Sequence, residues 1–369
     1  MNPIPVSRHT ITDDDALAVV ETLRSDWSTL GDVTERFEQA VATYTGARYA
    51  VAFNSAAAGL HAACSVAGIG PGRTLWTSAL APVSAANCAR YCWGAVDFVD
   101  VDPQSGNMDT TRLEEKLDVA EQQGRLPQAI MATHFAGQSA EMATIRQLAS
   151  RFDIAVIENA TMALGGAYQG DKVGSCKHSD MVVFGFQPTF PVTTCGGGVV
   201  VTNRTETWEK LLRFRTQGFS AQNEQIELGF DYELPGILAA LGASQIKRLD
   251  TLLAASNALA DEYDRALTGT SIQTPWRHPD VVSSWSIYPV RFASAERCVE
   301  AAQKLKEANI ATGQHFPPTH LQPYYRKLGF KPGDLPATEA YAGQAVSMPL
   351  YPGLQADEQA YVIEILKSL

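Results

Sequence analysis

Short apolar stretches alternate with segments of helical periodicity through most of this sequence, and this alternation limits the folds open to the chain. We expect strands over residues 49–53, 75–77, 95–99, 128–134, 181–186 and 199–202. Helices of about 10 to 15 residues separate several of them, a spacing typical of strand-helix-strand units. The sequence therefore predicts an α/β domain with a mostly parallel sheet, whose ligands gather at the carboxyl ends of the strands.

The ends of two helices carry local signals. Thr12 stands before three aspartates, a pattern that predicts a helix N-cap and an acidic first turn near Asp13. Pro235 suits the first position of a helix, and the apolar spacing behind it predicts one long helix over residues 235–267.

The length of 369 residues exceeds what a single hydrophobic core usually supports. We expect a large domain over residues 1-245 and a smaller C-terminal α+β domain over residues 246-369. The smaller domain is predicted to contain a strand over 285–292 and helices over 295–308 and 357–367.

Composition disfavours several classes of function. The net charge of -11 and the lack of a basic stripe argue against a nucleic-acid partner. No apolar run approaches the roughly 20 residues that cross a bilayer, and no signal segment begins the chain, so we expect a cytoplasmic protein without a membrane partner. The 6 cysteines show no CxxC spacing, which indicates neither a disulfide framework nor a metal site.

Several longer runs are diagnostic when they are taken together. They are VIENATMALGG at 156–166, FGFQPTF at 184–190, HFAGQ at 134–138, GSCKHSD at 174–180, HLQPYY at 320–325 and SMPLYPGL at 347–354. With them the chain resembles the DegT-type sugar-nucleotide aminotransferases, which hold pyridoxal phosphate (PLP). Within that family it is most similar to the subgroup that aminates a UDP-linked 4-keto-6-deoxy-N-acetylhexosamine on the way to pseudaminic acid. The resemblance implies the type I aminotransferase fold, with a large domain of mostly parallel sheet flanked by helices and a smaller C-terminal domain.

The resemblance also exposes departures from the family pattern. In the family the first run reads roughly V-I-E-D-A and the second F-S-F-x-x-x-K. The resemblance therefore puts Asn159 at the aspartate that charges the PLP ring, Phe190 at the Schiff-base lysine and Gly185 at a phosphate-side serine. Phenylalanine cannot form an imine, and asparagine cannot supply a counter-charge.

Four more family positions are altered at the implied phosphate and ring contacts. Ala57 and Ala58 stand where hydroxyl side chains grip the phosphate, at the predicted helix start after Asn54. Pro82 replaces a stacking aromatic residue, and Asp231 replaces an asparagine that reaches the phosphate of the neighbouring subunit. We therefore expect PLP to be absent. Related sugar dehydratases exchange the lysine for histidine, but Phe190 is apolar and the other positions change with it, which weighs against that chemistry.

The other side of the implied cleft agrees with the subgroup, and its aromatic faces and neutral donors suit a uracil ring and sugar hydroxyls. Lys172 and Lys177 are expected on exposed loops, away from it. The candidate cleft comprises Trp27, Asn54, Ala57, Ala58, Pro82, His134, Gln138, Asn159, Gly185, Gln187, Phe190, Asp231, His315, His320 and Tyr324.

Three functions stay open at this point. The first is a homodimeric protein that binds or processes a UDP-sugar without PLP, for surface or flagellar glycan synthesis. The second is a non-catalytic subunit that pairs with an active paralogue, since the family shares its active sites across a dimer. The third is a 4-aminotransferase that uses PLP or its amine form.

Overall fold

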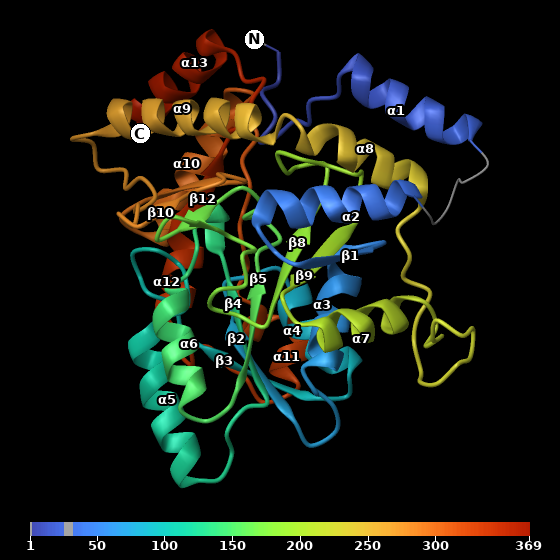
Figure 1. Cartoon of the computed structure of the whole chain (residues 1–369). Helices are drawn as coiled ribbons and strands as arrows, with labels where there is room; N and C mark the ends of the chain where they lie inside the picture. Colours follow the sequence, from blue (N-terminus) through green and yellow to red (C-terminus); the bar gives the residue numbers. More distant parts are fainter. Residues whose placement is uncertain (1, 26–31) are drawn as a thin grey trace.

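A seven-stranded sheet forms the centre of the computed structural model, which describes residues 2–25 and 32–369 (Figure 1). Its strand order is β1-β9-β8-β5-β4-β2-β3. The strands are β1 (Tyr49–Phe53), β2 (Thr74–Ser78), β3 (Ala95–Val99), β4 (Ala129–Thr133), β5 (Ala155–Asn159), β8 (Met181–Gly185) and β9 (Gly198–Thr202).

Only β9 runs against its neighbours in this sheet. It pairs antiparallel with both β1 and β8, whereas β2, β3, β4, β5 and β8 pair in parallel. The predicted α/β class with a mostly parallel sheet is therefore confirmed, as is the type I aminotransferase fold. The carboxyl ends of β4 and β5 meet with Thr133 opposite Asn159.

Alternate residues of the strands pack into hydrophobic cores on the two faces of the sheet. Val51, Met131, Ile157 and Val183 pack on one face with α3 (Ala56–Val66), α4 (Ser84–Tyr91) and α7 (Thr205–Arg215). Residues one position away, such as Ala52 and Val182, pack on the other face. That face is covered by α2 (Asp32–Thr45) and α8 (Gly236–Ile246), and farther along by α5 (Thr110–Gln122) and α6 (Met142–Ser150). Because both faces are buried, the strands are apolar throughout rather than alternating.

A separate core lies in the C-terminal part of the chain. It packs a two-stranded sheet against helices, and Ile4 joins it by bridging Ile310. The elements are α9 (Leu249–Leu267), β11 (Tyr288–Arg291), α10 (Ala295–Glu307), α12 (Pro336–Gln344), β12 (Ala345–Met348) and α13 (Ala356–Lys367). Whether this core and the central one are independent domains divided between residues 245 and 246 stays a prediction.

Smaller elements complete the described chain. They are α1 (Asp13–Arg24), β6 (Ala167–Tyr168), β7 (Asp171–Lys172), β10 (Val281–Val282), α11 (Pro323–Arg326) and two 3-10 turns at Phe135–Gly137 and Thr319–Leu321. The predicted cap at Thr12 is confirmed, since its hydroxyl accepts from the Asp15 backbone N–H at 3.4 Å. No helix in the described part of the chain has the length and apolar content needed to span a membrane.

The single helix predicted over 235–267 is wrong. The chain forms two helices, α8 and α9, with Arg248 at φ -114 and ψ 12 between them. The Arg248 guanidinium bonds to the Thr10 carbonyl and to the Asp15 carboxylate, both at 2.6 Å. The sequence has neither proline nor glycine at this break between α8 and α9. The break is stabilised by contacts of Arg248 with residues far away in the sequence, so no local pattern predicts it.

Two helical glycines should respond oppositely to an added methyl group. A Cβ on Gly242 would lie 2.5 Å from the buried Phe37 ring, whereas a Cβ on Gly343 would meet only Ala295, at 3.6 Å. We expect Gly242→Ala to lower the free energy of unfolding by about 1–3 kcal/mol. Gly343→Ala should raise it by about 0.5–1 kcal/mol, through helix propensity. Urea denaturation measures both, and equal effects of the two substitutions would contradict the close α2–α8 packing.

Candidate functional site

The carboxyl ends of β4 and β5 carry a small, neutral hydrogen-bond network. Asn159 is 1% exposed. Its Nδ2 donates to the Thr133 hydroxyl at 3.2 Å, and its Oδ1 accepts from the Thr161 hydroxyl at 2.9 Å. Both ends of the amide therefore have a neutral partner within the protein, and one of the two N–H groups of Nδ2 is used.

The loop that joins β8 to β9 brings Phe190 to this network. A Cβ on Gly185 would lie 3.0 Å from Phe190 Cε2 and 3.1 Å from the Thr161 carbonyl oxygen. The Phe190 ring thus lies against Gly185, next to the residue that holds Asn159. It also packs on the apolar cluster that contains Leu80 and Met162. Gln187 is exposed in the same loop and accepts the Phe190 backbone N–H at 3.0 Å.

The start of α3 lies beside the start of β9. A Cβ on Gly198 would be 2.6 Å from the Ala56 Cα, so only glycine allows this approach. Ser55 caps the helix, with its hydroxyl accepting from the Ala58 N–H at 3.0 Å. Ala57 and Ala58 add no hydroxyl, so the free N–H groups and the helix dipole are what this turn offers to an anion.

Asn54 and Asp231 are brought together at the same turn. The Asn54 backbone N–H donates to the Tyr232 carbonyl at 2.8 Å, and its side-chain Nδ2 donates to the Asp231 carbonyl at 3.4 Å. The Asp231 residue is exposed. It is the backbone of Asp231, not its carboxylate, that contacts Asn54. A negative charge on this segment disfavours a bound anion nearby, since like charges about 4 Å apart repel by roughly 4 kcal/mol at an effective dielectric near 20.

His134 and Gln138 are buried in contacts of their own. His134 is 0% exposed, and its Nδ1 accepts the Ala140 N–H at 3.2 Å. Its Nε2 therefore carries the proton and donates to Glu158, at 2.7 Å. Glu158 and Asn159 are consecutive on β5, so their side chains point to opposite faces of the sheet. Gln138 donates to the Trp276 carbonyl at 2.8 Å. The structure thus gives His134 a structural partner and leaves its predicted ligand contact without support.

The remaining predicted residues lie on C-terminal segments and on the turn before α4. His315 Nδ1 is 2.8 Å from the Ser347 hydroxyl, and burial lowers the pKa of this imidazole. His320 is fully buried, with Nε2 3.0 Å from Glu339 Oε1. The half-exposed Tyr324 accepts from Arg90 Nε at 3.3 Å.

The loop that carries Pro82 is tied to the C-terminal segment. Thr319 donates its N–H to the Ala79 carbonyl at 2.9 Å and its hydroxyl to the Ala81 carbonyl at 3.2 Å. Pro82 is half-buried in this loop. Trp27, the last predicted residue, lies outside the described residues.

Comparison with known proteins agrees with this fold. The family model described as "DegT/DnrJ/EryC1/StrS aminotransferase family" matches residues 9–367 of this chain. The chain belongs to this family. It is 31% identical over 384 residues to the spore coat polysaccharide biosynthesis protein SpsC of Bacillus subtilis, which covers 99% of this chain and 97% of that relative.

Two further relatives have names that describe a reaction or a pathway. The UDP-4-amino-4-deoxy-L-arabinose–oxoglutarate aminotransferase of Shewanella sediminis is 31% identical over 388 residues, 99% of this chain and 98% of that enzyme. The structure of Helicobacter pylori PseC, an aminotransferase in pseudoaminic acid biosynthesis, matches with a TM-score of 0.92 and 26% identity, covering 100% of this chain and 99% of PseC.

In this member of the DegT/DnrJ/EryC1/StrS family, the two lysines nearest in sequence to the site are held elsewhere. Lys172 Nζ lies 3.0 Å from the Tyr44 hydroxyl and 3.6 Å from Asp250. Lys177 pairs with Asp171 at 2.6 Å. In this structure neither ammonium group is directed to the place of an amine at position 190, since each has a partner elsewhere. No group of three His, Cys, Asp or Glu side chains within residues 2–25 and 32–369 could hold a metal ion.

Three polar residues of the site were not predicted from the sequence. Thr133 and Thr161 satisfy Asn159, and Glu158 holds His134. Threonines at strand ends are too common to single out. The adjacent pair Glu158-Asn159 could have been recognised, because consecutive polar residues at the end of a buried strand must each find a partner.

The contact between Gly185 and the Phe190 ring predicts a coupled effect on stability. Gly185→Ala should lower the free energy of unfolding by about 1–2 kcal/mol, because the new methyl group presses on the ring and on the Thr161 carbonyl. In a Phe190→Ala background we expect a smaller penalty, with a coupling energy of about 0.5–1 kcal/mol in a double-mutant cycle. Phe330→Ala, in a different core cluster, is the control and should leave the penalty unchanged.

The half-buried His315 predicts a loss of stability in acid. Burial holds its pKa below the ordinary 6.5, so as pH falls below this value the unfolded chain takes up a proton before the folded chain does. The neutral His315 contributes fully to the free energy of unfolding above the pKa that it has in the unfolded chain. This contribution decreases as the pH falls from that value to the lower pKa of the folded chain. His315→Gln should therefore flatten the fall of unfolding free energy below pH 6.5, measured by urea denaturation at several pH values. An unchanged slope would show that His315 already titrates normally when folded.

Proposed function

We propose that this protein binds a UDP-linked deoxy or amino sugar at the carboxyl edge of its sheet, and that it does not transaminate through PLP. The observation that carries the proposal is the contact of the Phe190 ring with Gly185, beside the neutral amide of Asn159 and its two threonine partners. We place its role in the synthesis of surface or flagellar glycans of the pseudaminic acid type.

The residues at the site do not fit PLP. The cofactor needs an amine to carry it, a carboxylate against its ring nitrogen and donors for its phosphate. Phe190 has no amine, and Asn159 Nδ2 already donates to Thr133. The Ser55 hydroxyl caps α3, and Asp231 lies exposed near the same turn. Each phosphate donor lost costs on the order of 1–3 kcal/mol of binding.

Burial explains why the amide at position 159 suits a site without a cationic ring. A carboxylate at a position 1% exposed needs a positive partner, because an unpaired buried charge is strongly destabilising. Without a protonated ring nitrogen an aspartate would have no such partner, whereas the neutral Asn159 amide is satisfied by two hydroxyl groups. The residues at 159 and 190 therefore support the same interpretation independently.

The sugar ligand is supported by the relatives. The Shewanella sediminis enzyme is named for a UDP-linked amino sugar, and Helicobacter pylori PseC for pseudoaminic acid biosynthesis. Both match nearly the whole of this chain. These names also favour a second candidate, a sugar-nucleotide 4-aminotransferase that uses PLP or its amine form. That candidate requires an amine to reach the cofactor from somewhere other than position 190.

A third candidate is a non-catalytic subunit that pairs with an active paralogue. It rests on the sharing of active sites between subunits implied by the family resemblance. Co-purification from cells with a lysine-bearing homologue would favour it, and an exclusively homodimeric species would count against it.

Spectroscopy and calorimetry together separate the first two candidates. We expect the purified protein, mixed with PLP, reduced with borohydride and desalted, to retain only the substoichiometric pyridoxyl absorbance that exposed lysines give, since position 190 offers no amine. Titration with UDP-N-acetylglucosamine in the calorimeter should give binding with or without PLP. With glutamate and a UDP-4-keto sugar, amino transfer should stay at the background rate.

The control is an active family member that has the lysine, treated in the same way. Retained pyridoxyl absorbance together with amino transfer in this protein would overturn the loss of PLP chemistry. Absence of any heat with UDP-sugars would overturn the binding half of the proposal.

A further inference from the structure

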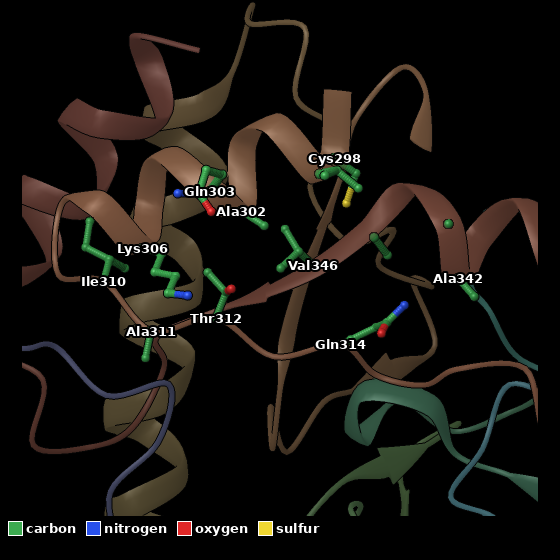
Figure 2. Close-up of a pocket in the computed structure, with 13 residues that line it drawn as sticks. Cys298, Ala302, Gln303, Lys306, Ile310, Ala311, Thr312, Gln314, Ala342 and Val346 are labelled. Carbon is green, nitrogen blue, oxygen red and sulfur yellow. The ribbon is translucent and has the colours of Figure 1, made fainter. Parts of the chain in front are cut away.

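A second cavity lies in the C-terminal core, between α10, residues 310–314, α12 and β12 (Figure 2). Its volume is about 600 Å³, within the range of about 300–1,000 Å³ usual for small-molecule sites. None of the residues that line it belongs to the candidate cleft described above. It is therefore separate from that cleft.

Small side chains create this cavity. Ala302 on α10 and Ala342 and Gly343 on α12 line it where the two helices pass each other. Its floor is formed by residues of β12 and of the segment 312–314, and Gly313 and Ser347 join these two segments through backbone hydrogen bonds of 3.1 and 2.8 Å. Buried Val346 and Cys298 complete an apolar wall. The floor is held by backbone hydrogen bonds, so the cavity is a formed feature of the fold.

One charged side chain, Lys306, lines the cavity among the described residues. Figure 2 shows its amine on the side of the cavity where Thr312 lies. No described residue forms an ion pair or a side-chain hydrogen bond with it. The nearby carboxylate of Glu307, on the same helix, instead accepts from Gln303 Nε2 at 2.8 Å. The cavity therefore offers an unpaired positive charge beside an apolar surface.

Neutral polar groups lie close to this charge. Thr312 carries a hydroxyl group and Gln314 an amide, and both residues line the cavity. Figure 2 shows them along one extended segment, opposite α10. A ligand with an anionic head could meet the ammonium and these donors at one end, and could lay an apolar body on Ala302, Val299 and Val346.

We propose that this cavity binds a small anionic amphiphile, with its carboxylate or phosphate head at Lys306 and its apolar body against α10 and β12. A cationic amphiphile fits less well because Lys306 repels it. A neutral amphiphile fits less well because it has no charge to pair with Lys306. The proposal goes beyond the sugar-binding function and does not depend on it.

The test uses the whole protein and three probes with the same chain, octanoate, octyl phosphate and octylammonium, in isothermal titration calorimetry. We expect the two anions to bind with one site per chain and octylammonium to bind more weakly. Lys306→Gln should weaken the binding of both anions by about 2- to 5-fold, the range of a solvent-exposed ion pair. Raising the salt concentration should shrink that difference. The tighter of the two anions identifies the head group.

Two further variants separate charge recognition from unspecific adsorption. Lys304→Gln removes an exposed lysine of the same helix that does not line the cavity, and it should leave the binding of every probe unchanged. Val299 lines the cavity and is 69% exposed, so Val299→Asp should fold normally. This variant should weaken octanoate and strengthen octylammonium.

Two results would overturn the proposal. One is the absence of anion binding to the unaltered protein. The other is an equal effect of Lys306→Gln and Lys304→Gln, which would assign the binding to general surface charge. Circular dichroism of each variant confirms that the fold is retained, so a loss of binding cannot be ascribed to unfolding.

Discussion

Burial of both faces of the central sheet is the constraint on which the rest of this structure depends. It makes the strands mostly apolar, and several polar residues at the strand ends pair with one another. Asn159, Thr133 and Thr161 form one such group, and His134 with Glu158 forms another on the opposite face. A buried polar group is costly when it is left unpaired, and the members of these two groups are paired within the fold. The chemistry of the site is therefore decided by which residues can be satisfied there without a charge.

The same reasoning connects positions that are distant in the sequence. A phenylalanine at position 190 is accommodated because position 185 has no side chain, and the ring then covers the neighbourhood of Thr161. An amide at position 159 is accommodated because the hydroxyl groups of Thr133 and Thr161 accept from it and donate to it. These replacements form a mutually compatible set rather than isolated losses, and the family scaffold around them is retained from residue 9 to residue 367.

The candidate sugar site and the C-terminal cavity differ in how the fold builds them. The candidate sugar site lies where strand ends, the start of α3 and the β8–β9 loop converge, so its residues come from many segments. The C-terminal cavity arises between two helices whose facing residues are small, above a strand edge held by the Gly313–Ser347 bridge. Its one charge, Lys306, projects from the last turn of α10.

The sequence by itself determined the α/β class, the parallel sheet, the Thr12 cap and the chemical incapacity of Phe190 to form an imine. These follow from local periodicity, capping chemistry and the identity of a side chain, none of which needs the fold. The tertiary structure decided the break at Arg248, the partner of His134, the contact of Phe190 with Gly185 and the C-terminal cavity. Each of these depends on residues brought together from distant parts of the chain, such as Arg248 with Asp15, and no local pattern encodes such a meeting.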